Sequence, residues 1–326
     1  MKQLKLFFAT ILLTVCFGMT SCSQTTAPGH SSVAGVFVAT TPCDDVSKKL
    51  LHIPLENKYD MMKWNLELYQ DPGTLTPTTY RLTCKYGLPK QGSRDFMEGA
   101  QTIELKGKWI MDKSFSGNTG AVVYTLTADN SPVSLSFLRA DTNLLHLLDG
   151  DRRLMIGNGA WSYTLNRADP VPSTTSIPIT IGTIQTTSLP PLSTDSLIVG
   201  VFDGRSPCNN NLLELNGISA NGCQIIKYRL TLYQDITTHI PTTFQLQNVY
   251  VGKGDTKYTT TGKWIVTKGT QTDPHAIVYQ LQPDSGKPQS LSFMKADDNI
   301  LFRLDKDRNL LAGNDYVSFT LNRVKR

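Results

Sequence analysis

After its first residues the chain lacks any long hydrophobic run, which excludes a bundle of membrane-spanning helices. The one apolar run, Leu6 to Phe17, is too short to cross a bilayer. The sequence also lacks basic clusters, because its 32 Lys and Arg stand against 27 Asp and Glu and are spread along the chain. No nucleic-acid-binding motif is present, and we therefore expect no nucleic acid among the partners.

Local motifs of the common enzyme classes are also missing. The sequence has no nucleophile elbow, phosphate-binding loop, dinucleotide fingerprint or metalloprotease helix. Its histidines do not show the close pairing of a zinc-binding motif, and ordinary strand or surface positions are the favoured interpretation for His52, His146, His239 and His275. We therefore expect a protein that is not an enzyme.

The first residues predict export and lipidation. Two lysines precede the apolar run, and small residues lead to Cys22, as in a secretory signal. Ser21 directly before Cys22 resembles the bacterial lipobox, although Met19 stands where that motif usually has Leu. We predict a signal peptide over residues 1–21 and a lipid anchor on Cys22; a plain cleaved signal with a chance cysteine is the alternative.

The residues after Cys22 bear on location. In enterobacterial lipoproteins an Asp in the next position retains the protein in the inner membrane, and here Ser23 occupies it. No acidic residue occurs between Cys22 and Asp44, whereas an acidic tag directs some lipoproteins to the cell surface. An outer-membrane lipoprotein facing the periplasm is the resulting expectation, with membrane lipid as its partner through the acylated Cys22.

The chain contains a tandem duplication. Residues 135–167 align with residues 291–323 at an offset of 156, and 19 of the 33 aligned positions are identical. A Gly-Lys-Trp motif ending at Trp109 recurs at Trp264, and a Pro-Cys pair ending at Cys43 recurs at Cys208. The repeat length of about 130 residues indicates two domains and exceeds the periods of solenoid repeats. We place the domains at residues 33–167 and 197–326.

Two further segments have the composition of tethers. The stretch from Ala168 to Asp195 holds five prolines and eleven Ser or Thr but no aromatic residue, which predicts an extended linker over residues 168–196. A shorter tether over residues 22–32 would join the first domain to the lipid.

Inside each domain the pattern is that of β-strands. Leu66 and Leu68 alternate with polar residues, and Leu230 and Leu232 do the same in the second domain. No stretch of ten or more residues has helical periodicity. Eight to ten short strands joined by turn-forming residues predict an all-β fold, with an up-and-down antiparallel β-barrel or a closed sandwich in each domain. A barrel of this size has room for side chains or one small ligand.

These features together resemble the N-terminal domain of the NlpE envelope lipoproteins. The features are a lipidated Cys, Gly-Val-Phe with Pro-Cys, a Leu-x-Leu strand, a Gly-x-Trp and a closing Tyr/Phe-x-Leu strand. The resemblance implies a lipocalin-like barrel, present twice, and a role in envelope stress sensing or copper tolerance. It also implies an envelope signalling protein as a candidate partner and copper as the one cofactor to consider.

The family carries a Cys-x-x-Cys pair near the first strand, and this chain departs from that pattern. Cys208 and Cys223 occupy the corresponding places, but fourteen residues lie between them instead of two. They are candidates for a structural disulfide or for a Cu(I) or Zn(II) thiolate pair. In the first domain Tyr59 aligns with Cys223, and Cys43 and Cys84 form a second candidate disulfide.

Other residues have two interpretations each. Trp109 and Trp264 are candidates for plugging one end of a barrel or for stacking on a ligand. Asp149 with Asp151, and Asp305 with Asp307, fit hairpin turns better than a cation site. Core filling is favoured over copper binding for the methionines Met61, Met62, Met97 and Met111.

The leading hypothesis is a membrane-anchored sensor or adaptor that uses its location and its disulfides as the signal. A binding module that holds a small hydrophobic or glycan ligand in its barrels is the first alternative. A structural accessory lipoprotein of an outer-membrane assembly is the second.

Overall fold

The computed structural model describes residues 31–112, 121–170, 197–208, 222–252, 254–255, 257–284 and 290–324. The predicted signal peptide, Cys22 and most of the 22–32 tether lie outside the described residues, as does the linker from residue 171 to 196. Within the described part of the chain, no helix is long and apolar enough to cross a membrane.

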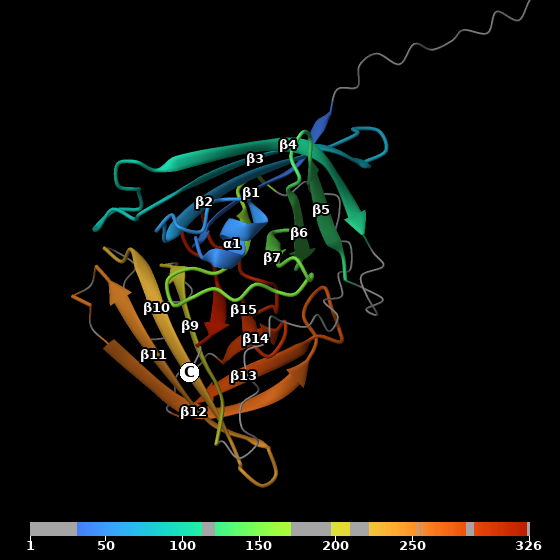
Figure 1. Ribbon diagram of the computed structural model, residues 1–326. Coiled ribbons are helices and arrows are strands. Elements are labelled where there is room, and N and C mark those ends of the chain that lie inside the picture. The colour runs from blue at the N-terminus through green and yellow to red at the C-terminus, as the bar shows by residue number, and fades with distance from the viewer. Residues whose placement is uncertain are drawn as a thin grey trace, which may run out of the picture. The chain divides into compact units, whose positions relative to one another are not determined.

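The first repeat folds into a closed antiparallel barrel of eight strands, each paired with its neighbours in sequence (Figure 1). This up-and-down order follows from short connections between consecutive strands, and closure leaves no unpaired sheet edge. Its strands are β1 (Ser32–Pro42), β2 (Met61–Gln70), β3 (Pro77–Gly87), β4 (Gln101–Asp112), β5 (Val123–Ala128), β6 (Ser134–Arg139), β7 (Leu144–Leu148) and β8 (Thr164–Arg167).

The second repeat forms a closed barrel with the same order, in which the last strand again pairs with the first. The prediction of an all-β fold with two tandem antiparallel barrels is confirmed, and each barrel has eight strands. The strands are β9 (Ile198–Pro207), β10 (Ile225–Gln234), β11 (Pro241–Val251), β12 (Lys257–Lys268), β13 (Ile277–Pro283), β14 (Leu291–Lys295), β15 (Ile300–Leu304) and β16 (Thr320–Arg323).

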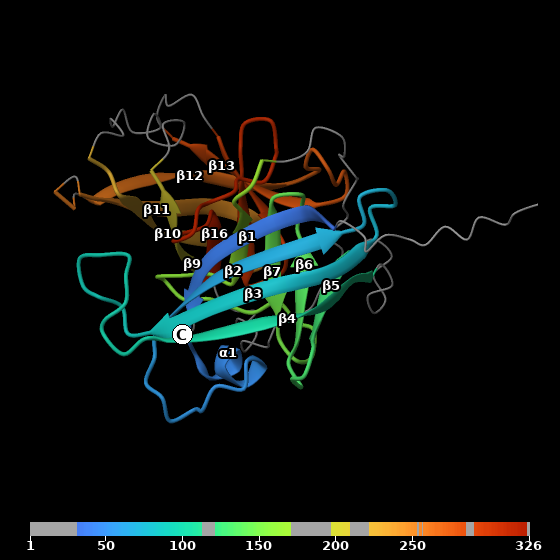
Figure 2. The same ribbon diagram turned by 90° about the horizontal axis from the view of Figure 1, so that it is seen from above.

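The long strands alternate between buried and exposed side chains. β2 and β3 lie side by side (Figure 2), Leu66 pairs with Leu82, and both leucines are fully buried while the residues beside them are more exposed. The alternation has the period of two expected of a strand with one face on a core. Each barrel therefore encloses its own apolar core, as the alternation in the sequence predicted.

One short helix interrupts the strand pattern, α1 (Asp45–Leu50), between β1 and β2. The Asp44 side chain accepts hydrogen bonds from the backbone N–H groups of Val46 and Ser47, which satisfies donors that the first turn leaves open. Lysines in the last turn complement the helix dipole. The sequence pattern did not predict α1, because six residues are too few to show helical periodicity.

The strands β7 and β15 are buried at every position instead of alternating. Their outward side chains, with those of β5, β6, β13 and β14, form one apolar cluster to which both repeats contribute. Leu144 and Leu148 of the first repeat belong to this cluster together with Ile300 and Leu304 of the second. The two barrels thus share an apolar contact, which we call the seam.

Polar groups in the seam pair with their own counterparts. Ser162 contacts Ser318 at 2.6 Å, and Thr164 contacts Thr320 at 2.9 Å, each pair being 156 residues apart. That separation equals the offset of the repeat. Contacts between equivalent residues are the mark of a two-fold, isologous interface, so the tandem barrels meet as the two subunits of a symmetric dimer would.

Two asparagines extend this symmetry. Asn166 Oδ1 accepts a hydrogen bond from the backbone N–H of Gly313 at 2.7 Å, and Asn322 Oδ1 accepts one from Gly157 at 2.9 Å. Both asparagines are buried, so these bonds satisfy polar groups that would otherwise cost stability. The Asn residues in the repeated Thr-Leu-Asn-Arg strands therefore hold the seam in register.

Candidate functional site

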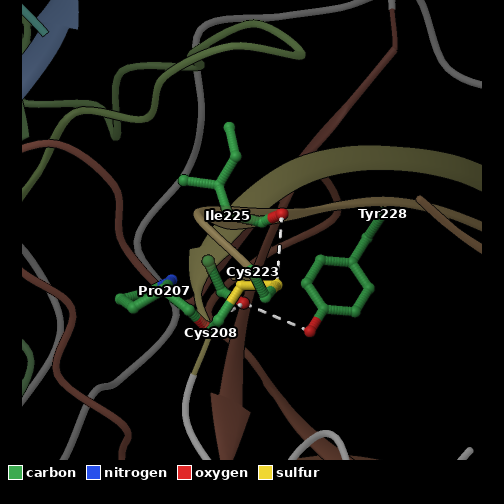
Figure 3. Close-up of a disulfide and its surroundings, with 6 residues drawn as sticks. Pro207, Cys208, Cys223, Ile225 and Tyr228 are labelled. Atoms are coloured by element: carbon green, nitrogen blue, oxygen red, sulfur yellow. Dashed lines mark hydrogen bonds between the residues drawn. A yellow bond between two sulfur atoms is a disulfide. The ribbon is translucent and has the colours of Figure 1, made fainter. Parts of the chain in front are cut away.

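Cys208 and Cys223 form a disulfide at one end of the second barrel (Figure 3). Cys208 follows β9 directly, Cys223 lies two residues before β10, and their Cα atoms are 5.9 Å apart. The bridge sits beside the first rung of the β9–β10 ladder, where Pro207 pairs with Ile225. The disulfide interpretation thus holds for this pair. In this oxidised state neither sulfur is a thiolate, the form in which cysteine binds metals.

Cys43 and Cys84 are both free and buried in the core of the first barrel. Cys43 follows β1, Cys84 lies on β3, and β2 runs between these two strands. Two strand spacings amount to about 9.6 Å, which is longer than the Cα separation that a disulfide tolerates. The candidate bridge between Cys43 and Cys84 is therefore not formed in this structure.

Burial also determines the protonation of these two thiols. Loss of solvation raises the pKa of Cys43 to about 11 and raises the pKa of Cys84 well above its usual value. Both groups remain neutral thiols at physiological pH, and a neutral thiol is a poor nucleophile and a poor metal ligand. Their environment is that of small apolar core residues.

The two repeated tryptophans have matching environments. Trp109 Nε1 donates to the Tyr69 carbonyl oxygen at 2.6 Å, and Trp264 Nε1 donates to the Tyr233 carbonyl oxygen at 2.7 Å. Both rings are buried, and each packs on a tyrosine, Tyr124 or Tyr279, with a centroid distance of 4.9 Å. A ring with its donor satisfied and its faces packed closes the core, whereas stacking on a ligand needs an open face.

The glycine two positions before each tryptophan also has a structural cause. A Cβ atom added at Gly107 would lie 2.0 Å from the Thr127 carbonyl oxygen, and one at Gly262 would lie 2.1 Å from that of Gln282. No side chain fits at these distances, so the backbones of neighbouring strands approach here only because the residue is glycine. The conserved pattern within the chain, Gly-Lys-Trp, is thus explained by packing.

The remaining candidates take up structural positions. Asp149 Oδ1 accepts hydrogen bonds from the N–H groups of Asp151 and Arg153, and Asp305 Oδ1 accepts them from Asp307 and Asn309, as expected of hairpin turns. His146 is fully buried between Thr164 and the Met155 carbonyl oxygen. Met61 and Met62 are fully buried, while Met97 and Met111 are exposed. Across the described ranges no group of three or more His, Cys, Asp or Glu residues could hold a metal ion.

The interiors of the two barrels differ at one level. In the first barrel Trp64 Nε1 donates to Thr41 Oγ1 at 2.8 Å, and the ring fills the space beside Phe137. In the second barrel Tyr228 stands in the place of Trp64, and a cavity of about 10 Å³ lies beside it. Sequence reasoning missed this cavity, although the loss of Trp64 in the second repeat is visible in the alignment.

Comparison with known families gives one match, to the NlpE N-terminal domain over residues 218–314. The second barrel is thus similar to the NlpE N-terminal domain over most of its length. The first barrel has the same strand order and repeats the sequence motifs of the second, which is consistent with a tandem duplication of one domain. NlpE proteins are a family of envelope lipoproteins, and the match is consistent with a protein of the cell envelope. No curated protein and no solved structure matches the chain.

Proposed function

We propose that this protein is a non-enzymatic lipoprotein of the bacterial envelope that reports envelope stress. The carrying observation is the match to the NlpE N-terminal domain, with a disulfide at the place of that family's cysteine pair. Cys22 would carry the lipid, and the outer membrane, facing the periplasm, would be the resting location. An envelope signalling protein would be the partner.

The proposed signal combines location and folding. Two acyl chains on Cys22 would anchor the protein stably, whereas a single chain holds only marginally. Failed lipidation would release both barrels into reach of a partner in the inner membrane. A disulfide at the mouth of the second barrel makes the fold of that barrel depend on oxidation, so a failure of disulfide formation would act on the same protein.

The proposal is tested by replacing Cys22. The Cys22→Ala variant should move from the membrane fraction to the soluble fraction and should change the output of an envelope-stress reporter. Cys16→Ala is the matched control, because it removes a neighbouring cysteine from the predicted signal and should leave fractionation and reporter output unchanged. Soluble Cys22→Ala protein with an unchanged reporter would refute the sensor role.

Copper tolerance is the second candidate function, and Cys208 and Cys223 are the residues that favour it. When reduced, these cysteines supply two neighbouring thiolates, which are ligands suited to Cu(I). Reduced protein should then bind Cu(I), while oxidised protein and the reduced Cys208→Ser/Cys223→Ser variant should not. Equal Cu(I) binding by all three forms would refute a site at this pair.

The structure gives less support to a hydrophobic ligand inside the barrels. The first barrel's interior at the level of Trp64 is filled by its own aromatic and aliphatic side chains, with Trp64, Leu82 and Phe137 nearly or fully buried. A hydrophobic-ligand module would need an open apolar cavity.

A further inference from the structure

An imidazole lies within the seam that joins the two barrels. His146 occupies the middle of β7 and is fully buried. Leu144 and Leu148, two residues away on either side, belong to the seam cluster, so strand alternation directs His146 to the same face. The ring packs edge-on against Phe302 of β15 with the ring centroids 5.7 Å apart (Figure 1 shows the two strands). Phe302 lies 156 residues further along, so His146 contacts its own counterpart in the other repeat.

Hydrogen bonds fix the neutral form of this imidazole. Nε2 lies 2.9 Å from the Met155 carbonyl oxygen, which can only accept, so Nε2 carries the proton. Nδ1 lies 3.0 Å from Thr164 Oγ1 and therefore accepts a hydrogen bond from that hydroxyl. Thr164 Oγ1 in turn lies 2.9 Å from Thr320 Oγ1 of the second barrel. A proton on Nδ1 would remove the acceptor and force the hydroxyls on both sides of the seam to turn.

The charged side chains on the strands that border the seam point away from His146. In the described strands they occupy the positions that alternate with the seam face, so they are directed into the interior of their own barrel. They are Arg139, Arg167, Lys295, Arg303 and Arg323. Arg303, which stands where the first repeat has Leu147, donates to the Tyr228 hydroxyl inside the second barrel at 3.1 Å.

Carboxylates flank the two central seam strands but do not pair with the imidazole. Asp141 and Asp149 lie in the turns at the ends of β7, and Asp297 and Asp305 lie in those at the ends of β15. No ion pair found among the described residues includes His146. Burial raises the pKa values of Asp141 and Asp297, so protonation of these two groups stabilises the folded protein in acid. Acid can therefore weaken the seam through His146 but not through them.

The sign of the effect follows from the environment of His146. Burial lowers the pKa of His146 from 6.5 to about 4, and the hydrogen bond to the Met155 carbonyl oxygen offsets only part of this change. In an open seam the ring meets water, and its pKa returns to the usual value. The open form therefore binds a proton more tightly than the closed form. The contribution of His146 to the closed seam is complete above pH 6.5 and is lost as the pH falls from 6.5 toward 4.

We propose that His146 makes the seam an acid-sensitive switch, whose opening separates two barrels that stay folded. Each barrel is closed by its own strands and encloses its own core. Opening uncovers the apolar side chains of the seam cluster, Leu148 and Leu304 among them. The proposed envelope signalling partner would then meet a surface that is hidden at neutral pH. This last step rests on the proposed function, whereas the opening of the seam does not.

The test measures amide hydrogen exchange, residue by residue, in the full-length protein in neutral detergent at pH 7 and pH 5. Each rate is divided by the rate of the unfolded chain at the same pH. The amides of Gly157 and Gly313 report on the seam, because their acceptors, Asn322 Oδ1 and Asn166 Oδ1, belong to the other barrel. The β2–β3 and β10–β11 ladders report on the barrels themselves.

Protection of the two glycine amides should fall about 20-fold from pH 7 to pH 5, as pKa values of 6.5 in the open form and about 4 in the closed form require. Protection in the two ladders should not change. Because the measurement uses purified protein and no stress reporter, its failure would leave the proposed function standing, and failure of that function would leave the switch standing.

Two variants assign the effect to the imidazole. His146→Phe gives the first repeat the residue that the second repeat has, and protection of the glycine amides should then be equal at the two pH values. Phe302→His places a second imidazole beside the first, and the fall in protection should exceed that of the wild type. Since Phe302→His retains His146, it decides the question even if His146→Phe does not fold.

Four outcomes would overturn the proposal. The first is unchanged protection of Gly157 and Gly313 in wild-type protein at pH 5. The second is an equal loss of protection in the ladders, which would mean that acid unfolds the barrels themselves. The third is a fall in His146→Phe as large as that of the wild type, and the fourth is a fall in Phe302→His no larger than that of the wild type.

Discussion

Asp297 and its repeat counterpart Asp141 are carboxyl groups held in unfavourable surroundings. Burial raises the pKa of Asp297 to about 7 and that of Asp141 to about 6, against a usual value of 3.8. In each case the backbone N–H groups two and three residues ahead lower the pKa again, but less than burial raises it. Asp297 Oδ1 accepts hydrogen bonds from the backbone N–H groups of Asn299 and Ile300. The side chain therefore stabilises this turn.

The pH dependence of stability follows from the sign of this shift. The folded protein binds a proton at Asp297 more tightly than the unfolded chain, so the associated stability is complete below pH 3.8 and is lost as the pH rises through about 7. Asp297→Asn retains the Oδ1 acceptor and removes the buried charge. We expect the variant to be more stable than the wild type above pH 7, by at most about 4 kcal/mol, and to match it near pH 4.

Urea unfolding at the two pH values measures this difference. Asp141→Asn is the matched variant in the first barrel, and its smaller pKa shift predicts a gain of at most about 3 kcal/mol at high pH. A stability difference for Asp297→Asn that does not change between acid and alkaline pH would show that the carboxyl is not strained by burial.

At the scale of elements, the alternating strands were predictable from the sequence, whereas the apolar contact between the barrels at β7 and β15 was not predicted. The pattern around Leu66 and Leu230 has the period of a strand with one buried face, and it predicted the barrels. The runs Leu144–Leu148 and Ile300–Leu304 are apolar almost without interruption, which is typical of strands buried on both faces. The sequence therefore indicated strands buried on both faces. In a barrel only the inner face of a strand meets the core, so burial of the outer face implies a second packing surface. That inference requires knowing that the fold is a barrel.

The cysteines show the same limit. The resemblance to the NlpE domain located Cys208 and Cys223 at the start of the barrel, where adjacent strand ends bring them together. The candidate disulfide between Cys43 and Cys84 is not formed, because β2 lies between the strands that position the two residues. The order of strands in the closed barrel could not be derived from the sequence pattern. The cavity beside Arg303 was missed for a related reason, since a buried position for an arginine is not expected from sequence alone.

Removal of the Cys208–Cys223 bridge tests its contribution to the second barrel. The bridge closes a loop of 15 residues, and closing a loop of this length stabilises a fold by about 3 kcal/mol through the lost entropy of the unfolded chain. The Cys208→Ser/Cys223→Ser variant should therefore unfold at lower denaturant concentration. Wild-type protein unfolded in the presence of reductant should reproduce the variant's curve. A variant as stable as the oxidised wild type would indicate that the bridge does not constrain the unfolded chain.

At the scale of the whole molecule, the duplication and the seam belong together. The barrels contact each other through equivalent residues. The first barrel contributes β7 to the seam, and the second contributes the equivalent strand, β15. A two-fold contact of this kind is what a single-barrel homodimer would use. Fusion of two copies in one chain keeps the partners at high effective concentration and frees the interior of one copy to change. Arg303 and Tyr228 show such a change in the second barrel only.

Because the seam buries apolar side chains from both repeats, the two barrels should unfold together. Replacing Asn166 and Asn322 by Ala removes the hydrogen bonds to Gly313 and Gly157 on both sides of the pseudo-two-fold axis. Each loss should cost about 1 kcal/mol or somewhat more, because the buried N–H groups are left without an acceptor. Differential scanning calorimetry should then resolve the single transition of the wild type into two. Asn65→Ala, at an exposed position on β2, should leave one transition. If the double variant also melts in one step at an unchanged temperature, the barrels are not coupled through these asparagines.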